Sequence, residues 1–289
     1  MKAEALREQV TQQVIDLMEE HGSDWIKPWA TTGGLPKNIA SHNHYKGINT
    51  FLLLNSRFPT PEWGTYKQWA AMGGQVRKGE KGTHIIFYKS LEVEDKETEK
   101  KKKIPMMRSY TVFNADQVEN SGIDEAVGDG NTFHHEAADG FIAGTAAKIT
   151  HSGSRAFYRI STDEIYLPPM TSFTSSDTSS AEESFYSTAL HELTHWTGHA
   201  SRNDRSKNAS FGGKNYAFEE LIAELGATFL SVELGLSPTP RTDHAKYLNN
   251  WMSALKDDKR FIFKAAAAAS RAVEYMHGLQ PQTVNQQAA

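Results

Sequence analysis

One short stretch constrains this chain more than any other. His191-Glu192-Leu193-Thr194-His195 has the pattern H-E-x-x-H. On an α-helix, residues four apart lie on one face, so His191 and His195 can bind a single metal ion together. Glu192 then lies beside the metal, where it can take a proton from a bound water. The stretch therefore predicts a metal-binding helix with Glu192 as its general base.

The flanking residues also predict a helix here. Ser180 and Glu183 have the spacing of a capping box at the helix start, and Gly198 is a typical helix stop. Between them, apolar residues recur at helical spacing on one side, namely Phe185, Ala189, Leu193 and Trp196. This context favours the metal site over the alternative, an exposed helix that carries two histidines by chance.

A catalytic zinc site needs a third protein ligand and an open position for water. A second predicted helix, 217–225, carries Glu220 and Glu224 on one face. The pattern is typical of zinc peptidases of the zincin kind and is similar to the gluzincin arrangement. That arrangement implies Glu220 as the metal ligand and Glu224 as the residue that holds the other ring nitrogen of His191. The two glutamates could exchange roles, or both could belong to a solvated acidic face.

Other candidates for the site come from the residues after the motif. Ser201 stands where a metzincin would have its third histidine, which argues against that class. His199 is an alternative ligand only if the helix continues past Gly198. Tyr216 and His199 are the nearest polar candidates for stabilising an oxyanion. We expect Zn²⁺ at the site, and another divalent metal would also fit.

Composition restricts the compartment and the class of protein. The chain has 289 residues and no cysteine, which excludes disulfides and thiolate metal sites and fits a reducing compartment. No segment approaches the roughly 18 consecutive apolar residues of a membrane helix, and the first 20 residues lack a signal-peptide core. The expectation is a soluble, cytoplasmic protein with no membrane partner.

Positive charge and aromatic residues are concentrated in the first half. Residues 25–90 carry nine basic and two acidic side chains, whereas residues from 121 onward carry 14 basic and 20 acidic ones. Basic side chains interleaved with aromatics favour single-stranded DNA, because cations contact phosphates and bases stack on rings. The alternative is that the aromatics form the core of a small domain. The candidate DNA-binding residues are Lys27, Trp29, Lys37, Tyr45, Lys46, Asn49, Trp69, Arg77, Lys78 and Lys81.

The pattern of elements predicts an α+β protein with two domains. Residues 1–125 form a small α+β single-stranded DNA-binding domain, and residues 126–289 form a mainly helical domain with a short β-hairpin. Expected helices lie near 6–18, 49–55, 133–148, 241–255 and 259–277. Expected strands lie at 83–91 and 109–113, on either side of a lysine-rich hairpin tip, and in a second hairpin at 156–167. Residues 73–82 are expected to be a flexible loop, and residues 120–131 a linker. In zincins an edge strand of this kind binds extended peptide.

The two halves together resemble the ArdC-type antirestriction proteins of conjugative plasmids, and the first half is also similar to the amino-terminal module of plasmid transfer primases. In the first half the resemblance rests on 27–29, 36–38, 45–49 and 76–82, and in the second on 191–199, Arg202, 211–212 and 216–225. It implies a single-stranded DNA-binding domain, a metallopeptidase-like domain and protection of incoming plasmid DNA from host restriction.

Three functions remain open. In the first, the zinc domain cleaves or engages an unidentified protein substrate or a component of the host restriction system, while the other domain binds DNA. In the second, the zinc is structural and the coating of single strands gives the protection. In the third, the protein is a general DNA-associated zinc peptidase that acts on proteins bound to DNA. They differ in whether Glu192 is required and in what is cleaved.

Overall fold

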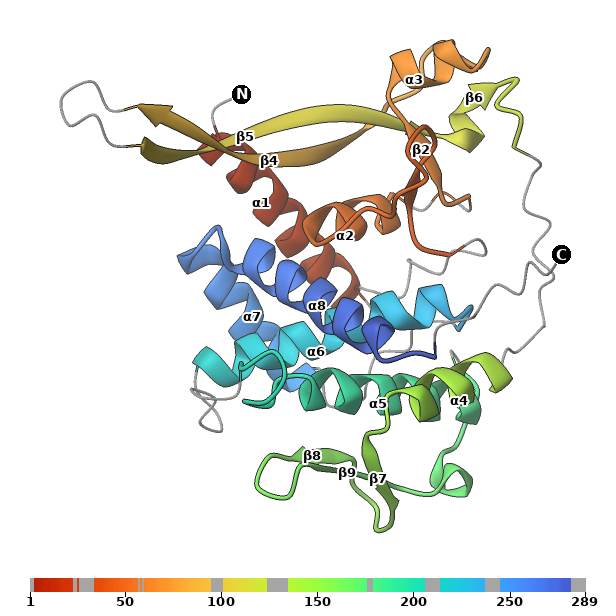
Figure 1. Ribbon diagram of the computed structural model, residues 1–289, viewed down its shortest axis with the longest axis vertical. Helices are drawn as coiled ribbons and strands as arrows, with labels where there is room; N and C mark the ends of the chain where they lie inside the picture. The colour runs from red at the N-terminus through yellow and green to blue at the C-terminus, as the bar shows by residue number, and fades with distance from the viewer. Residues whose placement is uncertain are drawn as a thin grey trace, which may run out of the picture.

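The structure is a computed structural model that describes residues 3–22, 25, 34–56, 58, 60–94, 101–123, 135–175, 179–205, 214–236 and 245–281. Figure 1 shows a long two-stranded ribbon with short helices around it, above a body of helices that carries a small sheet at its far end. The first part comes from the amino-terminal half of the chain and the second from the carboxy-terminal half. The predicted α+β class is confirmed.

The amino-terminal half is built on one sheet. Its strands run in the order β1-β2-β5-β4, with β1 parallel to β2 and the other pairs antiparallel. The helices α1 and α2 and the strands β4 and β5 were expected, although both strands are longer than predicted and run into the charged stretch at their tip. The elements are α1 (Ala3–His21), β1 (Lys37–Asn38), α2 (Ile48–Leu54), β2 (Glu62–Gly64), β4 (Thr83–Glu94) and β5 (Lys101–Asn114).

Short elements cover one end of this sheet. Helix α3 (Tyr66–Ala71) begins at a capping box formed by Thr65 and Gln68. Strand β3 (Gln75–Val76) pairs with β6 (Val118–Glu119), and a 3-10 turn occupies Ala115–Gln117. Residues 73–82 were expected to be a flexible loop. This was wrong for Gln75 and Val76, because they form β3 and pair with β6.

The carboxy-terminal half is mainly helical. Helices α5 and α6 carry the predicted metal residues, and α8 packs along α6 (Figure 1). A three-stranded sheet in the order β7-β9-β8 lies beside α5. The elements are α4 (His135–Gly144), β7 (Lys148–His151), β8 (Phe157–Arg159), β9 (Glu164–Leu167), a 3-10 turn at Met170–Ser172, α5 (Ala181–Trp196), α6 (Lys214–Glu233), α7 (Ala245–Asp257) and α8 (Phe261–Gly278).

The helix expected near 133–148 is shorter than predicted. It ends at Gly144, where the Thr145 hydroxyl donates to the Ile142 carbonyl and Ala146 adopts a φ of 54°. These local contacts close the last turn, and the chain then enters β7, a strand that was not predicted and whose first residue, Lys148, was expected to end the helix. The predicted hairpin is present as β8 and β9, with β8 at the edge of the sheet.

One hydrophobic cluster joins the two halves. It contains buried residues of α1 and α2 together with those of α5, α6, α7 and α8. At its centre the ring of Trp25 lies 6.0 Å from Phe51 and 6.3 Å from Trp251. The predicted boundary between 125 and 126 lies outside the described residues and stays a prediction. Among the described residues, no helix is both long and apolar enough to cross a bilayer.

Candidate metal centre and nucleic-acid surface

Helix α5 presents two histidines to the interior. The Ser180 hydroxyl accepts from the Glu183 amide, and the Glu183 carboxylate accepts from the Ser180 amide, so the predicted capping box starts the helix. The carboxy-terminal half of α5 is buried on nearly all sides, and it includes His191. The Nε2 atoms of His191 and His195 lie 3.1 Å apart. The helical spacing thus brings both ring nitrogens to one point.

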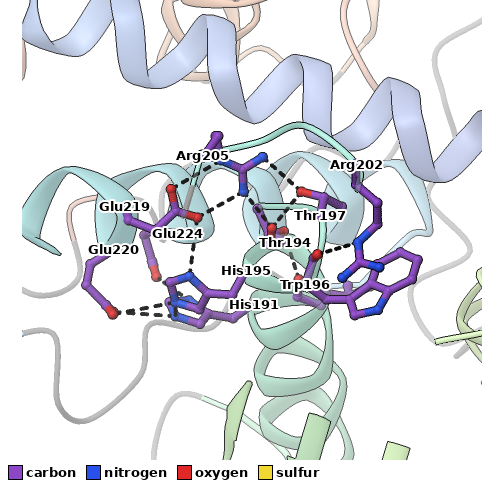
Figure 2. A network of polar contacts seen from close by, with 11 residues as sticks. His191, Thr194, His195, Trp196, Thr197, Arg202, Arg205, Glu219, Glu220 and Glu224 are labelled. Atoms are coloured by element: carbon purple, nitrogen blue, oxygen red, sulfur yellow. Dashed lines mark hydrogen bonds and ion pairs between the residues drawn. The ribbon is translucent and has the colours of Figure 1, made fainter. Parts of the chain in front are cut away.

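Glu220 approaches that point from α6. Its carboxylate oxygens lie 3.6 Å from Nε2 of His191 and 3.5 Å from Nε2 of His195. The three ligand atoms fall within 4.8 Å of one another, and Figure 2 shows them converging. Zinc–ligand bonds of about 2.1 Å in a tetrahedron separate the donors by roughly 3.4 Å. Two imidazoles and a carboxylate at these distances fit a divalent metal, with His191, His195 and Glu220 as its ligands.

Neighbouring charges shift the pKa values of two of the ligands, His195 and Glu220. Burial lowers the pKa of His195, but the charges of Glu220 and Glu219 outweigh it and raise the pKa to about 10. Burial also raises the pKa of Glu220, and the two histidines reverse this and hold the pKa far below its usual range. The carboxylate is therefore ionised at neutral pH, as a metal ligand must be.

The predicted supporting residues lie close to the ligands. Glu224 Oε2 is 3.5 Å from Nδ1 of His191, on the side of the ring opposite the ligand atom, where an orienting carboxylate is expected. Glu192 is buried on α5 beside the two histidines, and its charge also raises the pKa of His195. The side chain available as a general base is thus next to the metal position.

Glu219 and Arg205 are supporting residues that the sequence analysis missed. Glu219 Oε1 lies 3.5 Å from Nδ1 of His195, so the second histidine also has an orienting carboxylate. Arg205 donates to both oxygens of Glu219 at 2.9 and 3.2 Å, and to the Thr194 carbonyl at 2.8 Å. Figure 2 shows Arg205 joining the end of α5 to α6. Glu219 adjoins Glu220 in the sequence, but only the fold reveals that it faces His195.

Two further residues were suggested for the site from the sequence, and they are His199 and Tyr216. His199 is not part of the ligand group, because α5 ends at Trp196 and the ring instead accepts from the Ser201 amide at 3.2 Å. Its assignment as an alternative ligand was therefore wrong. Tyr216 lies near Glu220, and burial, followed by hydrogen bonding to Tyr247, raises its pKa. The phenol is therefore a protonated donor beside the ligand group.

An arginine holds the β8–β9 hairpin against the end of α5. Arg202 pairs with Asp163 in the hairpin turn and donates to the Trp196 carbonyl, while its guanidinium lies 4.0 Å from the Trp196 ring centre. Its hydrogen bonds lower the pKa of Asp163 to about 2. The edge strand β8 is thereby fixed relative to the metal ligands.

Four of the predicted DNA-binding residues make contacts within the fold. Trp69 is fully buried and its indole donates to the Phe113 carbonyl at 2.9 Å, so it cannot stack on a base and that assignment was wrong. Asn49 bonds both the amide and the carbonyl of Ile86, at 2.7 and 2.8 Å. Lys37 pairs with Glu62 at 3.0 Å. Burial is the main reason that the pKa of Tyr45 is raised.

Apart from Trp69, the predicted DNA contacts stay predictions. Lys46, Arg77, Lys78 and Lys81 are exposed, and Lys27 and Trp29 lie outside the described residues. The exposed large aromatics of this half lie on α3 and on the β4–β5 ribbon; they are Tyr66, Phe87, Tyr88 and Tyr110. Of the two tryptophans predicted to contact DNA, Trp69 is buried, and Trp29 is not among these described residues.

Comparison with known families agrees with this division. Residues 4–113 match the N-terminal domain of anti-restriction factor ArdC, and residues 136–268 match a zincin-like metallopeptidase. The metal-free crystal structure of the antirestriction protein ArdC from plasmid R388 superposes with a TM-score of 0.79 at 40% identity, over 95% of this chain and 97% of that one. The chain belongs to the ArdC family of antirestriction proteins.

Other relatives extend the family. The Mn(II)-bound structure of the same R388 protein has a TM-score of 0.76 at 38% identity, over 96% of this chain and 99% of that one. The uncharacterized protein y4eC of Sinorhizobium fredii (strain NBRC 101917 / NGR234) is 34% identical over 94% of this chain and 92% of that protein. Two Escherichia coli DNA primases called TraC are 37% identical over 97% and 96% of this chain, which spans only 28% and 20% of their lengths. The ArdC family thus includes a member that binds a divalent metal.

Proposed function

We propose that this ArdC-family protein binds single-stranded DNA, and that its metal site, with zinc as the expected ion, is a peptidase that protects incoming plasmid DNA from host restriction. The observation that carries the peptidase assignment is the convergence of His191, His195 and Glu220 beside the buried Glu192. A purely structural site would not need the buried carboxylate of Glu192 beside its ligands.

The side chains around the site can divide the work of peptide hydrolysis. The bound metal would make water more acidic and polarise the substrate carbonyl. Glu192 would take the proton of the attacking water and pass it to the leaving amine. Tyr216, which is protonated because its pKa is raised, can donate to the oxyanion. Glu224 and Glu219 hold the two imidazoles, and β8 offers an edge for an extended substrate.

The DNA-binding part of the proposal rests on charge and exposed rings. Residues 25–90 have seven more basic than acidic side chains. Exposed tyrosines and a phenylalanine accompany them on the ribbon. Together they supply the phosphate contacts and the stacking surfaces that single strands require.

The experiment is plasmid transfer into a restricting host, with the intact protein, a deletion and Glu192→Ala. Glu182→Ala is the matched control, because it removes an exposed carboxylate from the same helix. We expect Glu192→Ala to fail like the deletion while it still binds metal and DNA, and Glu182→Ala to protect fully.

The other outcomes favour the other functions. Full protection by Glu192→Ala would refute the peptidase role and favour a DNA-coating protein with a structural metal. An equal effect of the protein on transfer into hosts with and without restriction would favour a general peptidase for DNA-bound proteins.

A further inference from the structure

A groove of about 670 Å³ lies where the two halves meet. The strands β4 and β5 and the start of α2 form one wall, and α8 forms the other, with α1 at one end. Its lining is largely apolar, and its apolar members are Ile48, Ile86, Met107, Phe263 and Ala267. None of the metal ligands or their supporting carboxylates borders the groove, so it is separate from the metal site.

The segment 45–49, which the sequence analysis singled out, forms the joint at this groove. The Gly47 amide donates to the Ser270 hydroxyl of α8 at 2.7 Å. Gly47 has a φ of 59°, and a Cβ there would lie 3.6 Å from the Ala267 backbone, so the two halves approach closely. The Lys46 ammonium pairs with Glu274 of α8 at 2.5 Å. Both halves of the chain therefore form the groove.

Basic side chains surround the apolar lining. Five of them border the groove: Arg7, Lys46, Arg260, Lys264 and Arg271. Two carboxylates oppose them, since Glu274 pairs with Lys46 and Asp258 bonds both Arg260 and Lys264. Arg7 and Arg271 have no ion-pair partner among the residues that the structure describes. The rim thus keeps a surplus of three positive charges for an anionic ligand.

Tyr88 supplies an exposed ring in the same place. Its side chain lies on β4, borders the groove and is 61% exposed. A large aromatic side chain left in water beside an apolar groove is a surface on which a flat apolar group can stack. By contrast, the hollow beside Arg77 and Lys78 also contains Glu80 and Glu119, so its charges cancel.

We propose that single-stranded DNA occupies this groove, with a base stacked on Tyr88 and phosphates on Arg7 and Arg271. A polyanion with flat apolar groups matches both the charged rim and the apolar lining, whereas an acidic peptide would match only the rim. The inference rests on the proposed DNA binding and locates it. DNA would then contact α8, which packs against the metal-binding helix α6 and bonds it through His277 and Glu233 at 2.9 Å.

The test measures binding of the full-length protein to a fluorescent oligothymidylate over a series of salt concentrations. We expect Arg271→Ala to weaken binding and to reduce the slope of log affinity against log salt by about 0.7, as expected for one lost phosphate contact on a single strand. Tyr88→Ala should weaken binding about ten-fold, and Tyr88→Phe should restore it because the ring remains.

Matched controls come from other exposed surfaces. Arg155→Ala removes an exposed arginine of the carboxy-terminal half, and Tyr66→Ala removes an exposed ring beside Arg77. Neither residue borders the groove, so both variants should bind DNA like the intact protein. Because Tyr88 and Arg271 are themselves exposed, their variants should unfold at the same temperature as the intact protein.

The outcomes separate this inference from the proposed function. If the intact protein fails to bind the oligonucleotide, the DNA-binding proposal itself fails. If the intact protein binds and the Tyr88 and Arg271 variants bind equally well, DNA binds elsewhere and the groove assignment is overturned. Polyglutamate binding that displaces DNA and is unaffected by Tyr88→Ala would assign the groove to acidic proteins, which also overturns it.

Discussion

At the residue scale, the metal centre shows which contacts a sequence can reveal. His191, Glu192 and His195 were predictable because their spacing on one helix fixes their geometry. Glu220 followed from the likeness to gluzincins. The pairing of Glu219 with His195 and Arg205 was not predictable, because Arg205 lies in a turn whose path depends on the packing of α5 against α6.

The orienting role of Glu219 gives a prediction. Glu219→Gln removes the charge beside His195, and outer carboxylates of this kind typically contribute about 10–100-fold to metal affinity. We expect a weakening in that range in a Zn²⁺ or Mn²⁺ titration followed by calorimetry. Glu182→Gln on α5 should leave the affinity unchanged, and an unchanged affinity for Glu219→Gln would contradict the role.

The tryptophans show what the sequence could not reveal, namely which aromatic residues are exposed. Composition indicated that aromatic residues gather in the basic half, but it could not say which of them face solvent. Trp25, Trp63 and Trp69 are buried, and the smaller rings on the ribbon are exposed. The three tryptophans pack into buried clusters, whereas Phe87 and Tyr88 are consecutive on β4, point to opposite faces of the ribbon and are both exposed, so tertiary packing decides which rings reach solvent.

At the element scale, long periodic segments were predictable and short ones were not. The helices α1, α5, α6, α7 and α8 and the two hairpins follow from periodicity and capping. The two-residue strands β1 and β3 carry too few residues to show a period, and the four-residue β7 begins only four residues after the end of α4. Their pairing with distant partners decides their structure.

Asn49 joins α2 to β4, and this contact predicts a loss of stability when its side chain is removed. Asn49→Ala would leave the amide and the carbonyl of Ile86 without their partner, at a cost of about 1–3 kcal/mol. Urea unfolding would measure this, with Asn43→Ala at an exposed position as the control. Equal stabilities of the two variants would show that Asn49 does not hold these elements together.

The pair of His277 and Glu233 makes the α6–α8 contact depend on pH. Hydrogen bonding to Glu233 raises the pKa of His277 above its ordinary value. The pair therefore stabilises the folded state fully at a pH below the pKa of the unfolded histidine, about 6.5. This stabilisation is lost as the pH rises through the pKa of His277 in the folded protein. Since both side chains are partly exposed, the effect should stay below about 1 kcal/mol.

The corresponding measurement compares Glu233→Gln with the intact protein in urea unfolding. The variant should be less stable near pH 6, whereas near pH 9 the two proteins should converge. A difference that grows as the pH rises would have the wrong sign for this pair.

At the scale of the whole molecule, the two predicted domains share one hydrophobic cluster. The rings of Trp25, Phe51 and Trp251 belong to it, although more than 200 residues separate the first from the last. The sequence predicted two regions from their charges and motifs, but only the fold shows that their interiors are continuous. A chain with a common interior unfolds as one unit.

This predicts a single unfolding transition. Helical circular dichroism, which reports mainly on the second half, and tryptophan fluorescence should follow one curve in urea. Two separate transitions would show that the halves are stable independently, and the cluster would then be a weak interface between them.

The metal site is the basis of the proposed peptidase activity, and calorimetric titration of the metal-free protein with Zn²⁺ and Mn²⁺, beside Glu220→Gln, measures it. The convergence of His191, His195 and Glu220 predicts one bound ion per chain and a loss of at least about ten-fold in affinity when Glu220 is changed. Equal affinity for both proteins, or binding that does not saturate at one ion, would contradict the site.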